Sequence, residues 1–214
     1  MVSGQGRLAL EAIRQQLSLG FAPSFLILDV LAGKEPEIEA RRLGVPCFRL
    51  KSGSRSEVQG QIFELLKSQV ADWIFLTFDR ILDEGILNLF PERFLNLHLS
   101  LLPAFPGMRA LERALERGVP FVGATIHGVT ALVDDGPALA QCVHPVAEGE
   151  TRESMGQKMF PLIRILYLNV VRWAALDRIG KDSSGRPRIL AARPGTGRIT
   201  PEPEWWPETQ PVVP

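Results

Sequence analysis

Short apolar segments alternate with segments of helical periodicity along most of this chain. The apolar segments have the length and composition of buried strands, and they cover 24–30, 46–50, 71–78, 94–99, 123–132 and 138–146. Apolar spacing and charge patterning predict helices over 8–17, 35–43, 56–68, 109–118 and 151–179. Strands that alternate with helices are typical of an α/β fold with a mainly parallel sheet. In such folds, ligands bind at the carboxyl ends of the strands.

The charge balance argues against several classes of partner. The 214 residues contain 24 Lys plus Arg and 24 Asp plus Glu, whereas proteins that bind nucleic acid usually carry a basic excess. No run of about 18 apolar residues predicts a transmembrane helix, and residues 1–6 do not resemble a signal peptide. Cys47 and Cys142 fit two free thiols better than a disulfide scaffold. We therefore expect a cytoplasmic protein that binds neither nucleic acid nor a membrane.

The C-terminal segment differs in composition from the rest of the chain. Seven of the 17 prolines lie from Pro187 onward. Proline cannot continue a helix, so this segment is predicted to be an extended strap on the domain surface or disordered. Trp205 and Trp206 favour partial docking of the strap.

A glycine-rich turn near the N-terminus is the first candidate site. Residues 4–9 read Gly-Gln-Gly-Arg-Leu-Ala and match G-x-G-x-x-G/A, and Asp29 follows at the end of a predicted strand. This combination is the fingerprint of a dinucleotide site, but the fingerprint needs a preceding strand and only Met1 and Val2 are available. A phosphate or carboxylate site at the helix N-terminus fits better. A turn without a ligand remains an alternative.

Asn96 and His98 form the second candidate site. They lie two positions apart on a predicted strand, so their side chains point to the same face. A polar pair in an apolar strand is either satisfied by hydrogen bonds in the core or faces a cleft. A rigid loop that contains Pro103 and Pro106 follows directly, where α/β sites are built. This arrangement favours the cleft.

An acidic turn, Asp134-Asp135-Gly136-Pro137, joins the last two predicted strands. An Asx-turn would explain the aspartates on its own. Together with Asn96 and His98, however, the turn completes a set of amide, imidazole and carboxylate. These groups suit acyl transfer, because an amide and an imidazole stabilise an oxyanion while a carboxylate orients the imidazole or moves a proton.

These motifs together resemble the folate-dependent formyltransferases, and within them the glycinamide ribonucleotide transformylases. The resemblance rests on Asn96-x-His98-x-Ser100-Leu-Leu-Pro103 with Pro106-Gly107, followed by Asp134-x-Gly136-Pro137. The segment 78–82, Phe-Asp-Arg-Ile-Leu, is similar to the family's folate-lining segment, and 3–6 is similar to its phosphate loop. The similarity covers roughly 3–177.

The resemblance implies a Rossmann-like, mainly parallel sheet of the formyltransferase type, with a catalytic domain over 1–181 and a Pro-rich extension over 182–214. It implies transfer of a formyl group from 10-formyltetrahydrofolate to a primary amine of a small acceptor, without a metal. The expected acceptor is phosphoribosylglycinamide of purine biosynthesis.

The resemblance also implies roles for particular residues. Asn96 would bond the formyl oxygen, His98 would stabilise the oxyanion, and Asp134 would position His98 or a water. The implied folate contacts are Arg55, Arg80, Ile81, Leu82, Val133, Asp135 and Gly136. The implied acceptor contacts are Gly4, Gly6, Arg7, Ser100 and Gly107.

Several positions depart from the family's pattern. The chain starts inside the phosphate loop, so the first strand is expected to be missing, and Arg7-Leu8 replaces a polar Ser-Asn. Ile163 stands where the family has a Glu that recognises glycinamide. Leu99 replaces a Pro and Asp79 replaces a Met. The folate and catalytic part therefore matches the family better than the acceptor part.

Other functions stay open at this point. An amino sugar is an alternative acceptor, and hydrolysis of formyltetrahydrofolate needs no amine, although such hydrolases carry an N-terminal domain not seen in these 214 residues. Formylation of a tRNA usually comes with a further domain and a basic face. A non-catalytic folate-binding relative and, from 4–9 with Asp29, a NAD-dependent oxidoreductase are further alternatives. A homodimer is also open.

Overall fold

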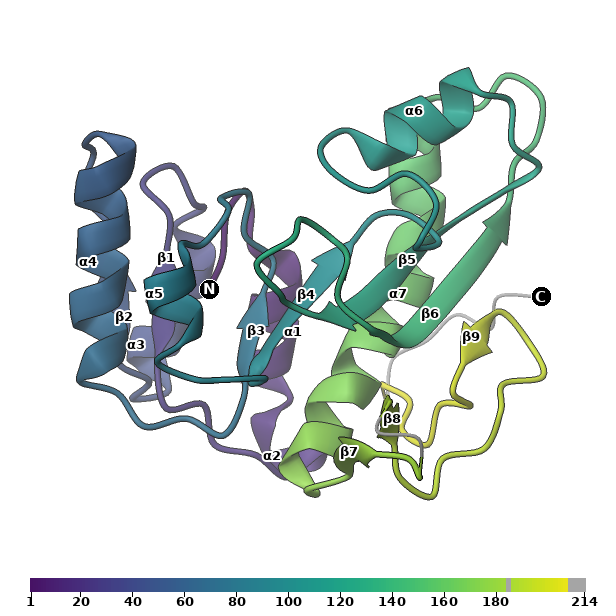
Figure 1. Cartoon of the computed structure of the whole chain (residues 1–214). Coiled ribbons are helices and arrows are strands. Elements are labelled where there is room, and N and C mark those ends of the chain that lie inside the picture. Colours follow the sequence, from purple (N-terminus) through teal and green to yellow (C-terminus); the bar gives the residue numbers. More distant parts are fainter. Residues whose placement is uncertain (184–185, 208–214) are drawn as a thin grey trace.

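The computed structural model describes residues 1–183 and 186–207. Figure 1 shows the predicted alternation of helices and strands. The helices are α1 (Arg7–Arg14), α2 (Gln16–Leu19), α3 (Glu35–Arg42), α4 (Arg55–Lys67), α5 (Glu84–Leu87), α6 (Ala110–Glu116) and α7 (Arg152–Ala175). The strands are β1 (Leu26–Leu28), β2 (Cys47–Arg49), β3 (Ile74–Leu76), β4 (Phe94–His98), β5 (Phe121–Gly128), β6 (Ala138–Pro145), β7 (Ile179–Lys181), β8 (Pro187–Ile189) and β9 (Ile199–Thr200). The predicted α/β fold class is confirmed.

Met1 and Val2 hold the place of a first strand between two parallel pairs. β1 pairs with β2, and β3 pairs with β4. Val2 forms parallel bridges to Leu28 on one side and Thr77 on the other. Its N–H donates to the Ile27 carbonyl at 2.9 Å, and the Thr77 N–H donates to the Met1 carbonyl at 3.0 Å. In the described residues no full strand precedes α1, as expected, but these two residues join the parallel pairs.

From β4 onward the sheet is antiparallel. β4, β5, β6 and β9 follow one another, and each pair runs in opposite directions. The register places Asn96 opposite His127 and His98 opposite Thr125. The pairing of β5 with β6 shifts between Ile126 and His127, and such irregularities re-aim side chains near functional sites. The parallel half therefore matches the prediction, and the antiparallel half brings a second histidine beside Asn96.

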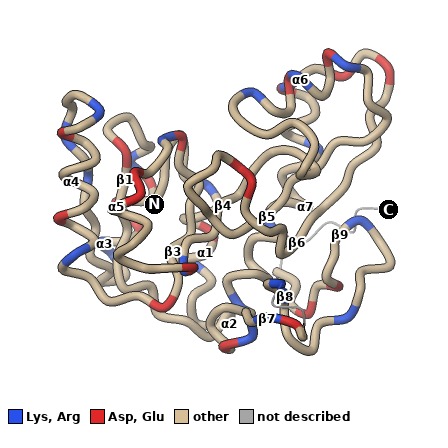
Figure 2. The backbone as a smooth tube through the Cα atoms, in the orientation of Figure 1, with Lys and Arg blue, Asp and Glu red and all other residues tan. Residues whose placement is uncertain are grey.

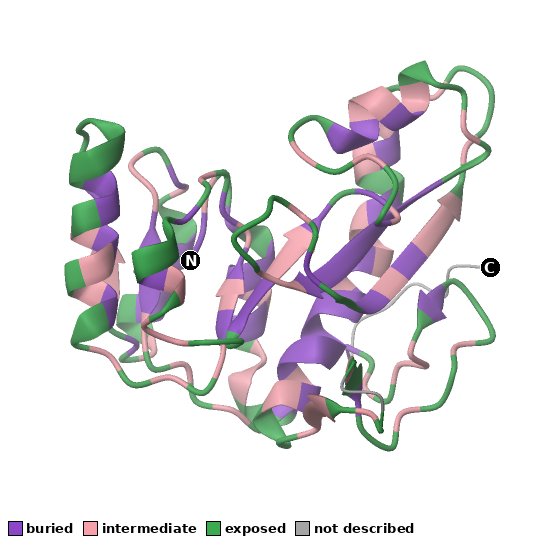
Figure 3. Cartoon of the chain, viewed as in Figure 1, coloured by how far each residue is buried: buried purple, intermediate pink, exposed green. Residues whose placement is uncertain are grey.

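The long helix α7 packs against β5 and β6. Its first turn is closed by a capping box between Thr151 and Ser154. Met155, Leu166 and Trp173 are fully buried, and they belong to the same core cluster as the inward residues of both strands. Figure 3 shows this buried zone along β4, β5 and the facing part of α7. The described part of the chain contains no helix long and apolar enough to cross a membrane.

The described part of the C-terminal segment is an extended strap. β9 adds an edge strand to β6, with Thr200 opposite Gln141. Further along, the buried Asn169 of α7 accepts the backbone N–H groups of Glu204 and Trp205, each at 2.9 Å. Trp205 packs against the core, whereas Trp206 is exposed. The predicted docking is therefore confirmed for Trp205, and residues 208–214 lie outside the described part.

Candidate active site

A cleft of about 1260 Å³ opens beyond the carboxyl ends of β3 and β4. It is bounded by the start of α1, the loops after β3, β4 and β5, and one side of α7. The candidate residues that line it are Gly6, Arg7, Arg55, Arg80, Ile81, Leu82, Asn96, His98, Gly107, Val133 and Asp134. Eleven of the fifteen candidates thus meet in one cavity, although they come from segments far apart in the sequence.

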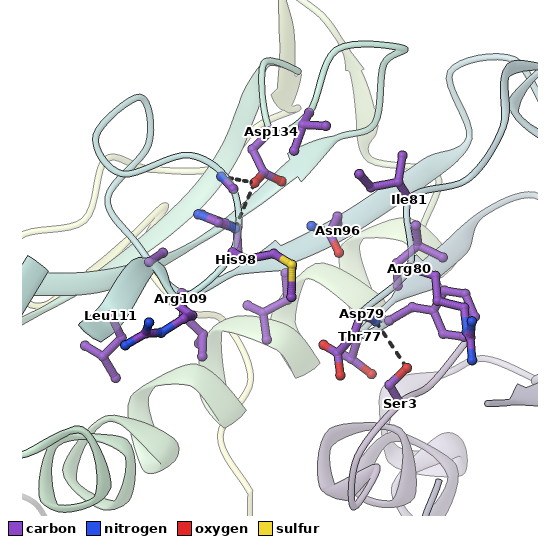
Figure 4. A pocket seen from close by; sticks show the side chains of 18 of the residues that line it. Ser3, Thr77, Asp79, Arg80, Ile81, Asn96, His98, Arg109, Leu111 and Asp134 are labelled. Carbon is purple, nitrogen blue, oxygen red and sulfur yellow. Dashed lines mark hydrogen bonds and ion pairs between the residues drawn. The ribbon is translucent and has the colours of Figure 1, made fainter. Parts of the chain in front are cut away.

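Asn96 and His98 project from β4 toward this cleft (Figure 4). His98 is almost buried, and both of its ring nitrogens face oxygen atoms. Nε2 lies 2.9 Å from the Phe105 carbonyl, and Nδ1 lies 3.2 Å from Oδ2 of Asp134. The ring of His98 is therefore held in place through both of its nitrogens.

Asp134 is held in place by its backbone and by two donors. Its φ of 54° is left-handed, a conformation that the short polar side chain of Asp tolerates better than most. Oδ2 accepts the Gly107 N–H at 2.7 Å in addition to facing His98. Contact with His127, the Gly107 amide and the charge of His98 outweigh burial and hold the pKa of Asp134 below its usual value. The carboxylate is thus ionised at neutral pH.

A buried hydrogen-bond network supports the loop that follows β4. The hydroxyl of Thr125 donates to the Ser100 carbonyl at 2.7 Å and accepts the Leu102 N–H at 3.1 Å. Gln141, the partner of Thr125 on β6, donates to Thr125 at 2.9 Å and to the Leu102 carbonyl at 3.0 Å. These bonds fix the loop that carries the Phe105 carbonyl and the Gly107 amide.

A second wall of the cleft is formed after β3. The guanidinium of Arg80 binds both carboxylate oxygens of Asp29 at 2.9 and 3.0 Å. Gln59 of α4 donates to the Ile81 carbonyl at 2.8 Å and accepts the Asp83 N–H at 3.1 Å. Across the cleft, Leu132 and Val133 are exposed, as is Ile81. We call these three residues, which face the cleft from its two sides, the apolar wall. Such exposed apolar side chains suit a flat aromatic ligand.

The bonding of Asp29 argues against a dinucleotide site. Ser3 donates to its Oδ2 at 3.1 Å, the Val30 N–H donates to its Oδ1 at 2.7 Å, and Arg80 pairs with both oxygens. Asp29 therefore links the N-terminal loop to the segment after β3, and its carboxylate is engaged within the protein.

The opposite side of the cleft is built from α1 and α7. Gly6 begins α1 with a φ of 64°, and a Cβ there would lie 2.8 Å from side-chain atoms of Val2 and Pro36, so only glycine fits. The Arg7 guanidinium lies 4.1 Å from the ring centre of Phe160, and Ile163 is buried beside it in the lining. We call Gly6, Arg7, Phe160 and Ile163 the acceptor end, and Asn96, His98, His127 and Asp134 the catalytic end, after the roles that the family resemblance implies for Gly6, Arg7, Asn96, His98 and Asp134.

Four candidates lie outside the lining, each for a physical reason. The buried Ser100 hydroxyl donates to the Ala104 carbonyl at 2.6 Å, so it braces its own loop. Gly4 is exposed and its carbonyl accepts the Gly33 N–H at 2.8 Å. Asp135 points into solvent. Gly136 packs on β5, since a Cβ there would lie 1.7 Å from the Gly128 carbonyl oxygen. Their expected ligand contacts stay predictions.

Sequence reasoning missed His127, Gln59 and Phe160, which all line the cleft. The signal for His127 was present, because it lies two residues after Thr125 on a strand and shares its face. Gln59 and Phe160 lie within helices, where nothing in the local pattern distinguishes a cleft residue from a surface one.

The electrostatics around the cleft are mixed. Figure 2 shows acidic and basic residues interspersed on α4 and α6. Arg55, Arg80, Arg109 and Arg152 line the cleft together with Asp79, Glu112 and Glu153. Among the described residues, no group of three or more His, Cys, Asp or Glu side chains is arranged to hold a metal ion.

Comparison with known proteins identifies the family. The sequence profile described as Formyl transferase matches residues 32–171. The chain belongs to the formyl transferase family. It is 34% identical over 141 residues to a formyltetrahydrofolate deformylase from Bacillus subtilis, covering 64% of this chain and 47% of that protein. It is 40% identical over 116 residues to a phosphoribosylglycinamide formyltransferase from Mycobacterium tuberculosis, covering 54% of this chain and 53% of that protein.

Solved structures of the formyl transferase family share the fold. Glycinamide ribonucleotide transformylase 1 from Symbiobacterium toebii superposes with a TM-score of 0.75 at 31% identity, covering 88% of this chain and 91% of that chain. The chain spans about half the length of the curated relatives named above. The resemblance inferred from the sequence motifs is confirmed at the level of family and fold.

Proposed function

We propose that the chain transfers the formyl group of 10-formyltetrahydrofolate to the primary amine of a small acceptor, with phosphoribosylglycinamide as the first candidate. The observation that carries this proposal is the convergence of Asn96, His98 and Asp134 in one cleft. The relatives named phosphoribosylglycinamide formyltransferase and glycinamide ribonucleotide transformylase 1 support the choice of acceptor.

The apolar wall and the backbone after β3 are suited to the pterin ring. Ile81, Leu132 and Val133 offer exposed apolar surface on both sides of the cleft mouth. Gln59 binds the backbone of Ile81, and the side chain of Arg80 binds Asp29. These bonds fix the backbone of residues 80–83, so its polar groups are held ready for a planar ligand. Such preorganisation lowers the cost of binding.

The catalytic end is suited to the formyl group. In the reaction the amine nitrogen adds to the formyl carbon, and the carbonyl oxygen becomes an oxyanion. The C–N10 bond of the folate then breaks, and a proton from the amine moves to N10. His98 stabilises the oxyanion electrostatically, while Asn96 donates a hydrogen bond to it. Asp134 orients His98 and accepts a proton through water.

The acceptor end is suited to a phosphorylated amine. The first turn of α1 presents free backbone N–H groups and a partial positive charge, which favour an anion. Arg7 adds a full charge at the same place and is supported by Phe160. These two features replace the polar side chains that the family's phosphate loop supplies.

Hydrolysis of formyltetrahydrofolate is the second candidate function. Two observations favour it: several relatives are formyltetrahydrofolate deformylases, and the buried Ile163 places an apolar group where the family's acceptor-recognising Glu is expected. Water would then replace the amine as nucleophile, and formate would be the product.

One experiment separates the two functions. The purified chain is mixed with 10-formyltetrahydrofolate, with and without phosphoribosylglycinamide, while folate absorbance and free formate are followed together. Transfer predicts a change in absorbance that requires the amine and releases no formate. Hydrolysis predicts formate in stoichiometric amounts without an amine. No change in either signal, with folate still bound, would leave a folate-binding protein.

A further inference from the structure

A second histidine lies in the catalytic end and is not used by the chemistry above. His127 is 2% exposed and lies opposite Asn96 in the β4–β5 register. Cross-strand partners on one face of a sheet are in contact distance, and the irregular pairing at this position turns the ring toward Asn96 and Asp134. A buried imidazole beside two reacting side chains needs a reason.

The first ring nitrogen of His127 has a fixed role. Nδ1 lies 2.7 Å from the carbonyl oxygen of Gly128. A carbonyl can only accept a hydrogen bond, so Nδ1 carries a proton. In a neutral ring the other nitrogen, Nε2, therefore has a lone pair and accepts.

The second ring nitrogen faces two groups with opposite demands. Nε2 lies 3.3 Å from the Asn96 amide nitrogen, which donates, and 3.5 Å from Oδ1 of Asp134, which accepts. A neutral His127 satisfies Asn96, whereas a protonated one satisfies Asp134 and places two donors against each other at Asn96. The shorter contact is the one with Asn96.

Two titratable groups face His127. They are Asp134, from the loop between β5 and β6, and His98, from β4, whose imidazole centre is 6.4 Å away. On β6 the partner of His127 is Ala138, which has no ionisable group. Asp134 lies closer to His98, at 3.2 Å, than to His127, at 3.5 Å, and its Oδ2 also accepts the Gly107 N–H. The carboxylate is therefore held on the side of His98, which leaves Nε2 of His127 to Asn96.

We propose that His127 is a positioning residue that acts in its neutral form, in which it orients the Asn96 amide toward the formyl oxygen and leaves Asp134 to His98. This proposal rests on the formyl transfer proposed above.

The test uses nuclear magnetic resonance on the full chain. The sequence contains three histidines, so long-range ¹H–¹⁵N spectra of the imidazoles are assigned by single variants. We expect His127 at pH 7.5 as the neutral ring protonated on Nδ1, and we expect the Asn96 side-chain amide resonances to shift in His127→Asn. A ring protonated on Nε2, or a cationic ring at pH 7.5, would overturn the proposal even if the chain shows no transferase activity.

Two substitutions give the functional readout. His127→Gln keeps an acceptor for Asn96, so it should retain kcat within about tenfold. His127→Asn keeps the bond to Gly128 but is too short to reach Asn96. Its kcat should therefore fall by about ten- to a hundredfold, no more than loss of an oxyanion donor costs, with the KM for folate unchanged. Equal losses of kcat in His127→Gln and His127→Asn would contradict the proposal.

His144 supplies the matched control. Its Nδ1 makes the same contact with the carbonyl of the next residue, Pro145, at 2.7 Å, but it lies outside the cleft lining. His144→Gln should leave kcat unchanged. If wild-type turnover is absent altogether, the formyl transfer fails while the spectra still decide the state of His127.

Discussion

The two ends of the cleft are built in different ways. At the catalytic end, Asn96, His98 and Asp134 are held by partners inside the protein, and a buried network fixes the loop behind them. At the acceptor end, the described residues place no carboxylate within ion-pair distance of Arg7, whose guanidinium rests on Phe160. Rigid positioning suits a reaction centre, whereas a charge directed into solvent suits recognition of a ligand.

We infer from this difference that the two ends depend differently on the substrate. Groups that act on the formyl carbon are needed whatever the nucleophile is. Groups that recognise the acceptor depend on its identity, and here Arg7 and Ile163 stand at positions where the family has polar groups. Substitutions at one end should therefore leave the other end unchanged.

The largest effect is expected at His98. His98→Ala removes the imidazole beside the oxyanion and should lower kcat by about a hundredfold or more, with or without an amine acceptor. Steady-state kinetics with 10-formyltetrahydrofolate measure this, and His144→Ala is the matched control because His144 lies outside the cleft. A decrease in kcat of tenfold or less would contradict a role for His98 in stabilising the oxyanion.

Asp134 is expected to rank second. Asp134→Asn keeps the left-handed backbone, which Asn also tolerates, but it removes the charge that faces His98. The expected decrease in kcat is about ten- to a hundredfold. Asp135→Asn is the control, since Asp135 is exposed in the same turn. Near wild-type turnover for Asp134→Asn would indicate that the residue only shapes the turn and takes no part in the reaction.

The third prediction separates the acceptor end from the catalytic end. Arg7→Ala should raise the KM for a phosphorylated amine by about tenfold, the usual worth of a charge-assisted hydrogen bond, while the KM for folate stays constant. Arg14→Ala is the control on the same helix, because Arg14 pairs with Glu35 on the surface. An unchanged KM in Arg7→Ala, with formate still released, would favour hydrolysis.

The smallest effect on activity is expected far from both ends. Asn169→Ala leaves two backbone N–H groups of the strap without their acceptor, which should reduce the free energy of unfolding by about 1–3 kcal/mol and leave kcat nearly constant. Denaturant unfolding measures the first and steady-state kinetics the second. Trp206→Ala, in the exposed part of the strap, should change stability by less than about 0.5 kcal/mol. A large loss of kcat in Asn169→Ala would connect the strap to the cleft.

Much of the fold could be read from the sequence because its cues are local. The apolar run 24–30 and the shared face of Asn96 and His98 depend only on alternation along a strand. The pairing of β4 with β5 depends on residues far apart in the sequence, so the contact between Asn96 and His127 was not predicted. The two-residue strand β9 is too short to have a pattern of its own.

The candidate site was predicted in part for the same reason. Arg80 and Asp134 were found through motifs, since each lies in a loop directly after a strand. Ser100 matched its motif, yet its hydroxyl bonds within its own loop, and a motif does not show where a side chain points. Phe160 had no motif, because its role depends on the packing of α7 beside α1.

The most direct test of the proposed function follows a labelled formyl group through a single turnover. The chain is mixed in excess with 10-formyltetrahydrofolate that carries ¹³C in the formyl group, with phosphoribosylglycinamide present, and the quenched products are separated. The result expected is label in the formamide of the acceptor in the wild type and unreacted folate in His98→Ala. Label in formate alone, or equal turnover by the wild type and His98→Ala, would contradict it.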